Sequence, residues 1–270
     1  MLSELLLQKK DFQAAASPDN EAALPDVLPV ESEPEIASDT TLLGIVEILL
    51  KNPATADRLN RDPELQAHLI PRFLAIALCS YALFSVAMLV ILNAAPTSAY
   101  PGRFLAIPPA NWRDGTAMWL VAGYLVGMVA ASCVCLPSFY FFALLSGVRM
   151  TMLQIVGQVV RGTATSALML VGILPIYVTV VLGLVIFHSP LEFLEGGLSV
   201  GLVLPFLAGL AGVHAIYRGV TGMAETLPDE CRSSRACFLR RLTVSWAVCY
   251  TAVCPVMIFR LWESVAGLFA

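Results

Sequence analysis

Apolar residues dominate the chain from about residue 73 onward, and they come in runs longer than a soluble core needs. The longest run, Gly115 to Val148, holds 34 consecutive residues without Asp, Glu, Lys or Arg. A bilayer core about 30 Å thick is crossed by a helix of about 20 apolar residues. The runs therefore predict five transmembrane helices, over residues 73–95, 117–137, 163–187, 197–217 and 242–259.

The longest run raises the question of one crossing or two. As a helix it rises about 51 Å, which is too little for two full crossings. We expect one crossing over 117–137 and a helix that breaks or bends at Pro137. The aromatic residues 139–142 then lie at the membrane interface, where such rings collect. Pro175 and Pro205 fall inside later spans and predict bends, since neighbouring helices can satisfy the freed carbonyls.

Polar residues between Ser146 and Arg161 recur every three or four positions, which places them on one stripe of a helix. These residues are Thr151, Gln154, Gln158 and Arg161. The pattern favours an interfacial amphipathic helix that lies in the membrane plane. The alternative is that this segment packs inside the bundle.

The first 70 residues differ from the rest. Residues 1–40 carry eight acids over positions 11–40 and four prolines, a mixture that predicts a disordered cytoplasmic tail. Residues 41–70 predict short cytoplasmic or interfacial helices over 41–51, 53–60 and 63–70, the first capped by Asp39 or Thr40. Asn52-Pro53 and Asp62-Pro63 each combine a cap with proline at the first helical position. Residues 71–270 form the five-span transmembrane domain, so the fold class is an all-α polytopic membrane helix bundle.

Composition and charge support a membrane protein and give its orientation. The chain is 58% hydrophobic and 13% charged, against about 25% charged residues in soluble domains. With five spans, 13 of the 16 basic residues fall on the N-terminal side of the membrane. The positive-inside rule then places the N-terminus in the cytoplasm and the C-terminus outside.

Candidate chemistry is sparse. The cores of the predicted spans lack the ionisable residues that transporters and pumps commonly carry. His214 is the one candidate relay residue, and a histidine hydrogen-bonded at the interface is the favoured alternative. His188 with Glu192 and Glu195 is a weak candidate for a divalent cation. The seven cysteines show no C-x-x-C spacing, and no catalytic, cofactor-binding or nucleic-acid-binding motif is present. We therefore assign no catalytic, cofactor or metal site and predict that the protein is not an enzyme.

Three segments carry a family resemblance: "VEILLKNPATADRL", "PSFYFFALLSGVRMTMLQIVGQVVRG" and "GLVLPFLAGLAGVHAIYRG". Together with the acidic tail and five spans, over residues 42–265, they resemble the Yip-type (Ypt/Rab-interacting) five-span membrane proteins and their bacterial relatives. In eukaryotes the resemblance implies vesicle traffic and Rab binding. An excess of Arg over Lys indicates a GC-rich bacterial genome, and hence the inner membrane. The family pattern supplies no catalytic residue.

Two functions follow as hypotheses. The first is a non-enzymatic subunit or scaffold. Its small-residue faces, such as Gly123 and Gly127, would bind partner membrane subunits, and its tail would bind a cytoplasmic partner. The alternative is a transporter or channel for a small solute or ion, in which proline-bent helices frame a midplane site.

Overall fold

The computed structural model describes residues 41–60, 63–96, 113, 115–145, 151–224 and 229–269. In this part the chain is helical and has no strand. The helices are α2 (Leu42–Lys51), α3 (Pro53–Leu59), α4 (Pro63–Ala94), α5 (Thr116–Leu145), α6 (Met152–Ile186), α7 (Leu191–Ala224) and α8 (Asp229–Phe269). The predicted disorder of residues 1–40 lies outside the described residues.

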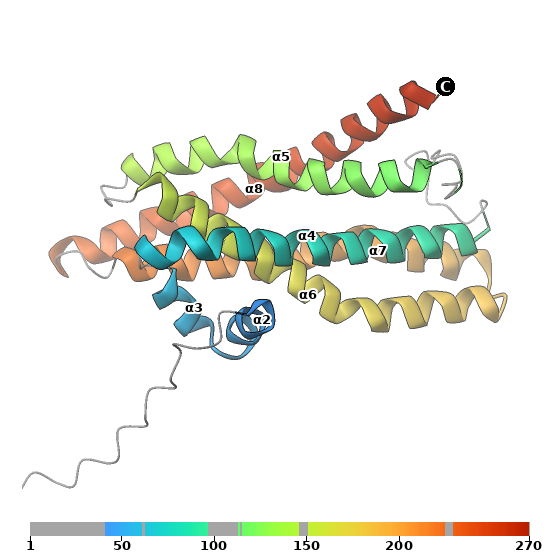
Figure 1. The fold of residues 1–270 in the computed structure, drawn as a ribbon, viewed down its shortest axis with the longest axis horizontal. Coiled ribbons are helices and arrows are strands. Elements are labelled where there is room, and N and C mark those ends of the chain that lie inside the picture. Colours follow the sequence, from blue (N-terminus) through green and yellow to red (C-terminus); the bar gives the residue numbers. More distant parts are fainter. Residues whose placement is uncertain are drawn as a thin grey trace, which may run out of the picture. The chain divides into compact units, whose positions relative to one another are not determined.

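Five helices, α4 to α8, are long and apolar enough to cross a membrane, which confirms the predicted fold class. In Figure 1, α4, α5 and α7 run nearly parallel along the long axis of the view, whereas α6 and α8 cross it obliquely. Many large apolar side chains point outward from them, as expected where lipid replaces water as the solvent. Examples are Leu83, Val126, Val134, Ile176, Val203, Leu207, Val248 and Val256.

The short helices are capped by polar side chains. Thr41, rather than the predicted Asp39 or Thr40, caps α2, since its hydroxyl accepts a hydrogen bond from Gly44 N at 3.2 Å. Asn52 caps α3 through Thr55 N at 3.2 Å, with Pro53 at the first helical position as predicted. α2 is seen nearly end-on in Figure 1, so it runs across the direction of the long helices.

One predicted boundary at a proline was wrong. The helix expected over 63–70 and the first span are one helix, α4, with Pro71 inside it. At Pro137 a break or a bend was expected, and since α5 continues through this residue, the break does not occur. Proline removes one hydrogen bond, to the carbonyl four residues earlier. The carbonyls concerned are those of Ala67 and Cys133, and the helix continues past each of them.

The interpretation of residues 146–161 as an interfacial helix was also wrong for the described part. Thr151 and Gln154 form a capping box that starts α6 at Met152, and α6 then runs unbroken to Ile186. Gln158 and Arg161 are 1% and 2% exposed, so this half of the polar stripe faces the protein interior, whereas Thr151 is exposed and Gln154 is half-buried. Inside the bundle it meets polar partners from α3 and α4, as described below.

The long helices pack as two groups. α4 packs mainly on α6 and α6 on α7, whereas α5 packs mainly on α8, and contacts between the groups are fewer. Gly162 and Gly212 bring α6 and α7 close, because a Cβ on Gly212 would lie 2.6 Å from Gly162 O. In the other group, Trp246 Nε1 donates to Cys135 O at 3.1 Å.

Candidate functional site

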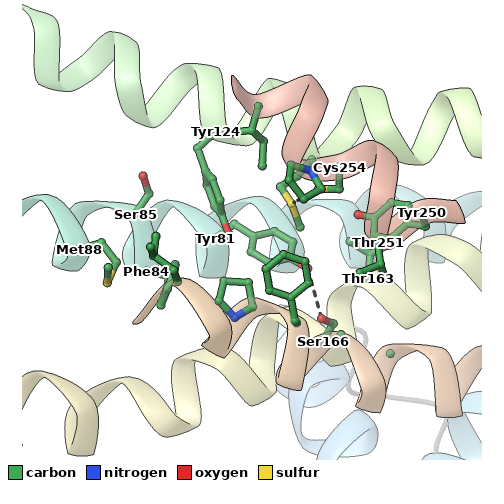
Figure 2. A pocket seen from close by; sticks show the side chains of 18 of the residues that line it. Tyr81, Phe84, Ser85, Met88, Tyr124, Thr163, Ser166, Tyr250, Thr251 and Cys254 are labelled. Carbon is green, nitrogen blue, oxygen red and sulfur yellow. Dashed lines mark hydrogen bonds between the residues drawn. The ribbon is translucent and has the colours of Figure 1, made fainter. Parts of the chain in front are cut away.

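A cavity of about 370 Å³ lies among the long helices, and all five of them contribute to its wall. It extends from Asn93 near the end of α4 to Gly162 and Trp246 near the opposite end of the bundle. Figure 2 shows part of its lining, with side chains from several helices pointing toward a common space. Most of the wall is apolar, including Phe84, Met88, Met128, Leu202, Phe206 and Ile258.

Three tyrosine hydroxyls add hydrogen-bonding groups to this apolar wall. Tyr81 Oη donates to Ser166 Oγ at 3.4 Å, the dashed line in Figure 2. Ser132 Oγ donates to Tyr250 Oη at 3.4 Å. The Tyr124 hydroxyl is buried and has no hydrogen-bond partner among the described residues. Buried polar groups are normally paired, so Tyr124 has a donor available to a ligand.

The lining has no charge. Among the described residues that line the cavity there is no Asp, Glu, Lys, Arg or His. An ion placed there would lose its hydration without gaining a counter-charge, which is strongly unfavourable. The cavity therefore suits an uncharged molecule.

Two prolines modify the backbone at the cavity. Proline has no N–H, so Pro205 and Pro255 leave the carbonyls of Gly201 and Thr251 without their usual helical donors. All four residues line the cavity. In transporters, discontinuous helices place backbone acceptors at solute sites; here α7 and α8 are continuous, and the prolines alone free the two carbonyls. Pro205 was among the prolines predicted to frame a midplane site, Pro255 was missed, and Pro137 and Pro175 do not line the cavity.

A second feature is a buried polar cluster, which we define as Asp57, Asn60, Gln66, Gln158 and Arg161. Arg161 of α6 forms an ion pair with Asp57 of α3 through Nη1. Its Nη2 also donates to the backbone carbonyl of Ala215 in α7 at 2.6 Å. Each residue of the cluster is at most 8% exposed. An ionisable residue inside a span was not expected from the sequence, and such residues are usually functional.

The histidines singled out from the sequence lie elsewhere. His214 is exposed on α7 and belongs to neither the cavity nor the polar cluster. His188, Glu192 and Glu195 are exposed, and the described residues hold no group of three His, Cys, Asp or Glu that could bind a metal. The sequence signal that was missed is the position of tyrosines deep inside apolar spans, because an interfacial tyrosine lies at a span's end.

The chain matches no family model, and no curated protein or solved structure is significantly similar to it. The resemblance to the Yip-type family and the absence of enzymatic activity therefore stay predictions.

Proposed function

We propose that this protein binds a small uncharged amphiphile within the membrane and transports it, the alternative function that the sequence left open. The cavity carries the proposal: it is apolar, uncharged and includes the unpaired donor of Tyr124. An apolar body would occupy the cavity, and a hydroxyl, ether or carbonyl oxygen would accept from Tyr124.

The size of the cavity supports a small solute. Ligand pockets usually measure about 300–1,000 Å³, and a cavity of about 150 Å³ holds benzene. At about 370 Å³ the cavity accommodates one aromatic or aliphatic unit with a polar group no larger than a single sugar ring. Hydroxyls on that group slow unaided crossing of the bilayer, because they lose their hydrogen bonds to water in the hydrocarbon core.

The division of the long helices into two groups supports a transport mechanism in which one group moves against the other. The cavity wall includes both the α4–α6–α7 group and the α5–α8 group. Rocking of one helix group against another around a central site is how many transporters expose a solute alternately to each side. The sparser contacts between the groups make such a movement feasible.

The test is uptake into liposomes that contain only this protein. The probes are radiolabelled phenyl glucoside, which is uncharged, and phenyl phosphate, which is charged. We expect uptake of phenyl glucoside above that of empty liposomes and none of phenyl phosphate. Absence of uptake across a panel of uncharged aromatic glycosides, amides and alcohols would contradict the proposal.

Two glycines provide a matched pair of variants. A Cβ at either Gly209 or Gly172 meets no atom within 4 Å, but only Gly209 lines the cavity. Gly209→Trp should reduce uptake at least tenfold, because the indole fills the space, whereas Gly172→Trp should leave uptake within twofold.

The subunit or scaffold role stays a prediction. It depends on the acidic tail, which lies outside the described residues, and on the small-residue faces, of which Gly127 packs against Ile258 of α8 in the same chain. Isolation of the full chain in mild detergent with stoichiometric partners would support it.

A further inference from the structure

The polar cluster lies directly beyond one end of the cavity. We call this the α3 end of the bundle; α4 and α6 also begin there (Figure 1). Gly162 and Ile216 line the cavity, and the residues that precede them, Arg161 and Ala215, are joined by a hydrogen bond. None of the five cluster side chains lines the cavity itself. The cluster therefore forms a layer between the cavity and that end.

Helix α3 is the outermost part of this layer. Pro53 and Ala54 at its start are exposed, whereas Asp57 and Asn60 at its other end are 8% and 1% exposed. The ion pair between Asp57 and Arg161 is a polar contact that holds α3 to α6. Because Arg161 also binds α7, one side chain links α3 to two of the helices that form the cavity.

The closed arrangement leaves hydrogen-bonding capacity unused. Both polar atoms of the Asn60 amide, Gln66 Nε2 and Gln158 Oε1 are buried without partners among the described residues. Glycine allows these amides to press against the backbone: a Cβ on Gly157 would lie 2.6 Å from Gln66 Nε2. An unpaired buried amide disfavours the state that contains it. Entry of water would satisfy these groups, so hydration favours an open state of the same region.

We propose that the cluster is a gate, in which the Asp57–Arg161 pair holds α3 over the end of the cavity. Loss of that pair releases α3, hydrates the Asn60, Gln66 and Gln158 amides, and connects the cavity to the aqueous phase at the α3 end. The gate's role in controlling solute access rests on the proposed transport function. Its opening does not, and is measured separately.

The experiment is cysteine labelling of the otherwise cysteine-free full chain in lipid nanodiscs, with a water-soluble maleimide. Thr163→Cys reports on the cavity near the gate, and Met88→Cys reports on its other end, since both positions line the cavity. Asp57→Asn should raise the labelling rate at position 163 at least fivefold and raise the rate at position 88, at the far end of the same cavity, by a smaller factor. Glu47→Gln, which removes an exposed ion pair with Lys51, is the matched control and should change neither rate.

A second variant acts in the opposite direction. Asn60→Leu removes two unpaired buried polar atoms while keeping a similar shape, and should lower the labelling rate at position 163 at least threefold. If Asp57→Asn does not fold, the labelling rate of Asn60→Leu alone tests whether the cluster is a gate. Unchanged rates at position 163 in the folded variants would overturn the gate, even if solute uptake is observed. Changed rates without uptake would support the gate and contradict transport.

Discussion

At the scale of single residues, the Arg161 side chain of α6 joins two other helices, since it contacts Asp57 of α3 and the backbone of Ala215 in α7. Its ion pair with Asp57 is buried, and breaking a buried pair by removing one partner typically costs about 3–5 kcal/mol. We expect Arg161→Met to lower the free energy of unfolding by about that much, because the Asp57 carboxylate is then left without its counter-charge. Reversible unfolding in mixed micelles measures it.

Two further variants separate the charge from the packing. The double variant Asp57→Leu with Arg161→Met should recover most of the loss, since no buried charge remains. Lys51→Met breaks the exposed pair and should change the unfolding midpoint far less than Arg161→Met does, because exposed pairs contribute little. If Arg161→Met alone were neutral, the pair would not contribute to stability.

The close packing of α6 and α7 depends on the absence of a side chain at Gly212. A Cβ there would lie 2.6 Å from Gly162 O and 2.9 Å from Ser166 Cβ, and a backbone oxygen cannot move aside as a flexible side chain can. Gly212→Ala should therefore push α6 and α7 apart and destabilise the fold by about 1–3 kcal/mol, as overpacking does. Gly209→Ala, on the same helix in open space, is the control and should be neutral or stabilising in the same unfolding assay.

At the scale of elements, α2 carries a local prediction about pH. Lys51 Nζ donates to Glu47 Oε1 at 2.7 Å, and this bond with the neighbouring charge lowers the pKa of Glu47 from its usual 4.5. A carboxylate with a lowered pKa stabilises the folded helix above its unfolded pKa. That contribution should be lost as the pH falls below about 4.5.

The pKa of Glu47 can be read from carboxyl carbon NMR shifts of the full chain labelled at Glu, with Glu47→Gln to assign the signal. We expect Lys51→Met to move the pKa up toward 4.5. Arg218→Met, which removes an exposed positive charge on α7, should not move it. A pKa that is the same with and without Lys51 would show that the pair does not form.

The periodicity of apolar and polar residues predicted the helices of this chain but not the partners of their polar faces. The existence of five spans followed from apolar runs, and the start of α3 followed from Asn52-Pro53. The sequence pattern did not reveal which surroundings the polar stripe on α6 faces. A polar helix face looks the same whether it meets water or buried polar partners, and Asp57 lies 104 residues away along the chain from Arg161.

At the scale of the whole molecule, the cavity depends on all five long helices at once. Tyr81, Tyr124 and Tyr250 come from α4, α5 and α8, and each sits in an apolar run without any local motif. Only the packing of the two helix groups brings these hydroxyls together. The sequence could therefore predict a bundle and a midplane site framed by Pro205, but it could not predict which side chains face that site.

The number of crossings and the distribution of basic residues together predict how the whole chain is oriented in the membrane. Three of the long helices, α4, α5 and α6, separate Lys51 from His188, so the two positions must lie on opposite sides if each helix crosses once. Arg161 lies inside α6 and is set aside; of the other 15 basic residues, 12 fall on the side that holds Lys51, and basic loops are retained in the cytoplasm. In otherwise cysteine-free chains expressed in bacteria, a membrane-impermeant maleimide should label His188→Cys in intact cells. Lys51→Cys should be labelled only after permeabilisation. Labelling of both positions in intact cells would mean that one of the three helices does not cross, with α5 and its central Pro137 the first to suspect. The reverse pattern would keep the five crossings and show that the basic side faces outward.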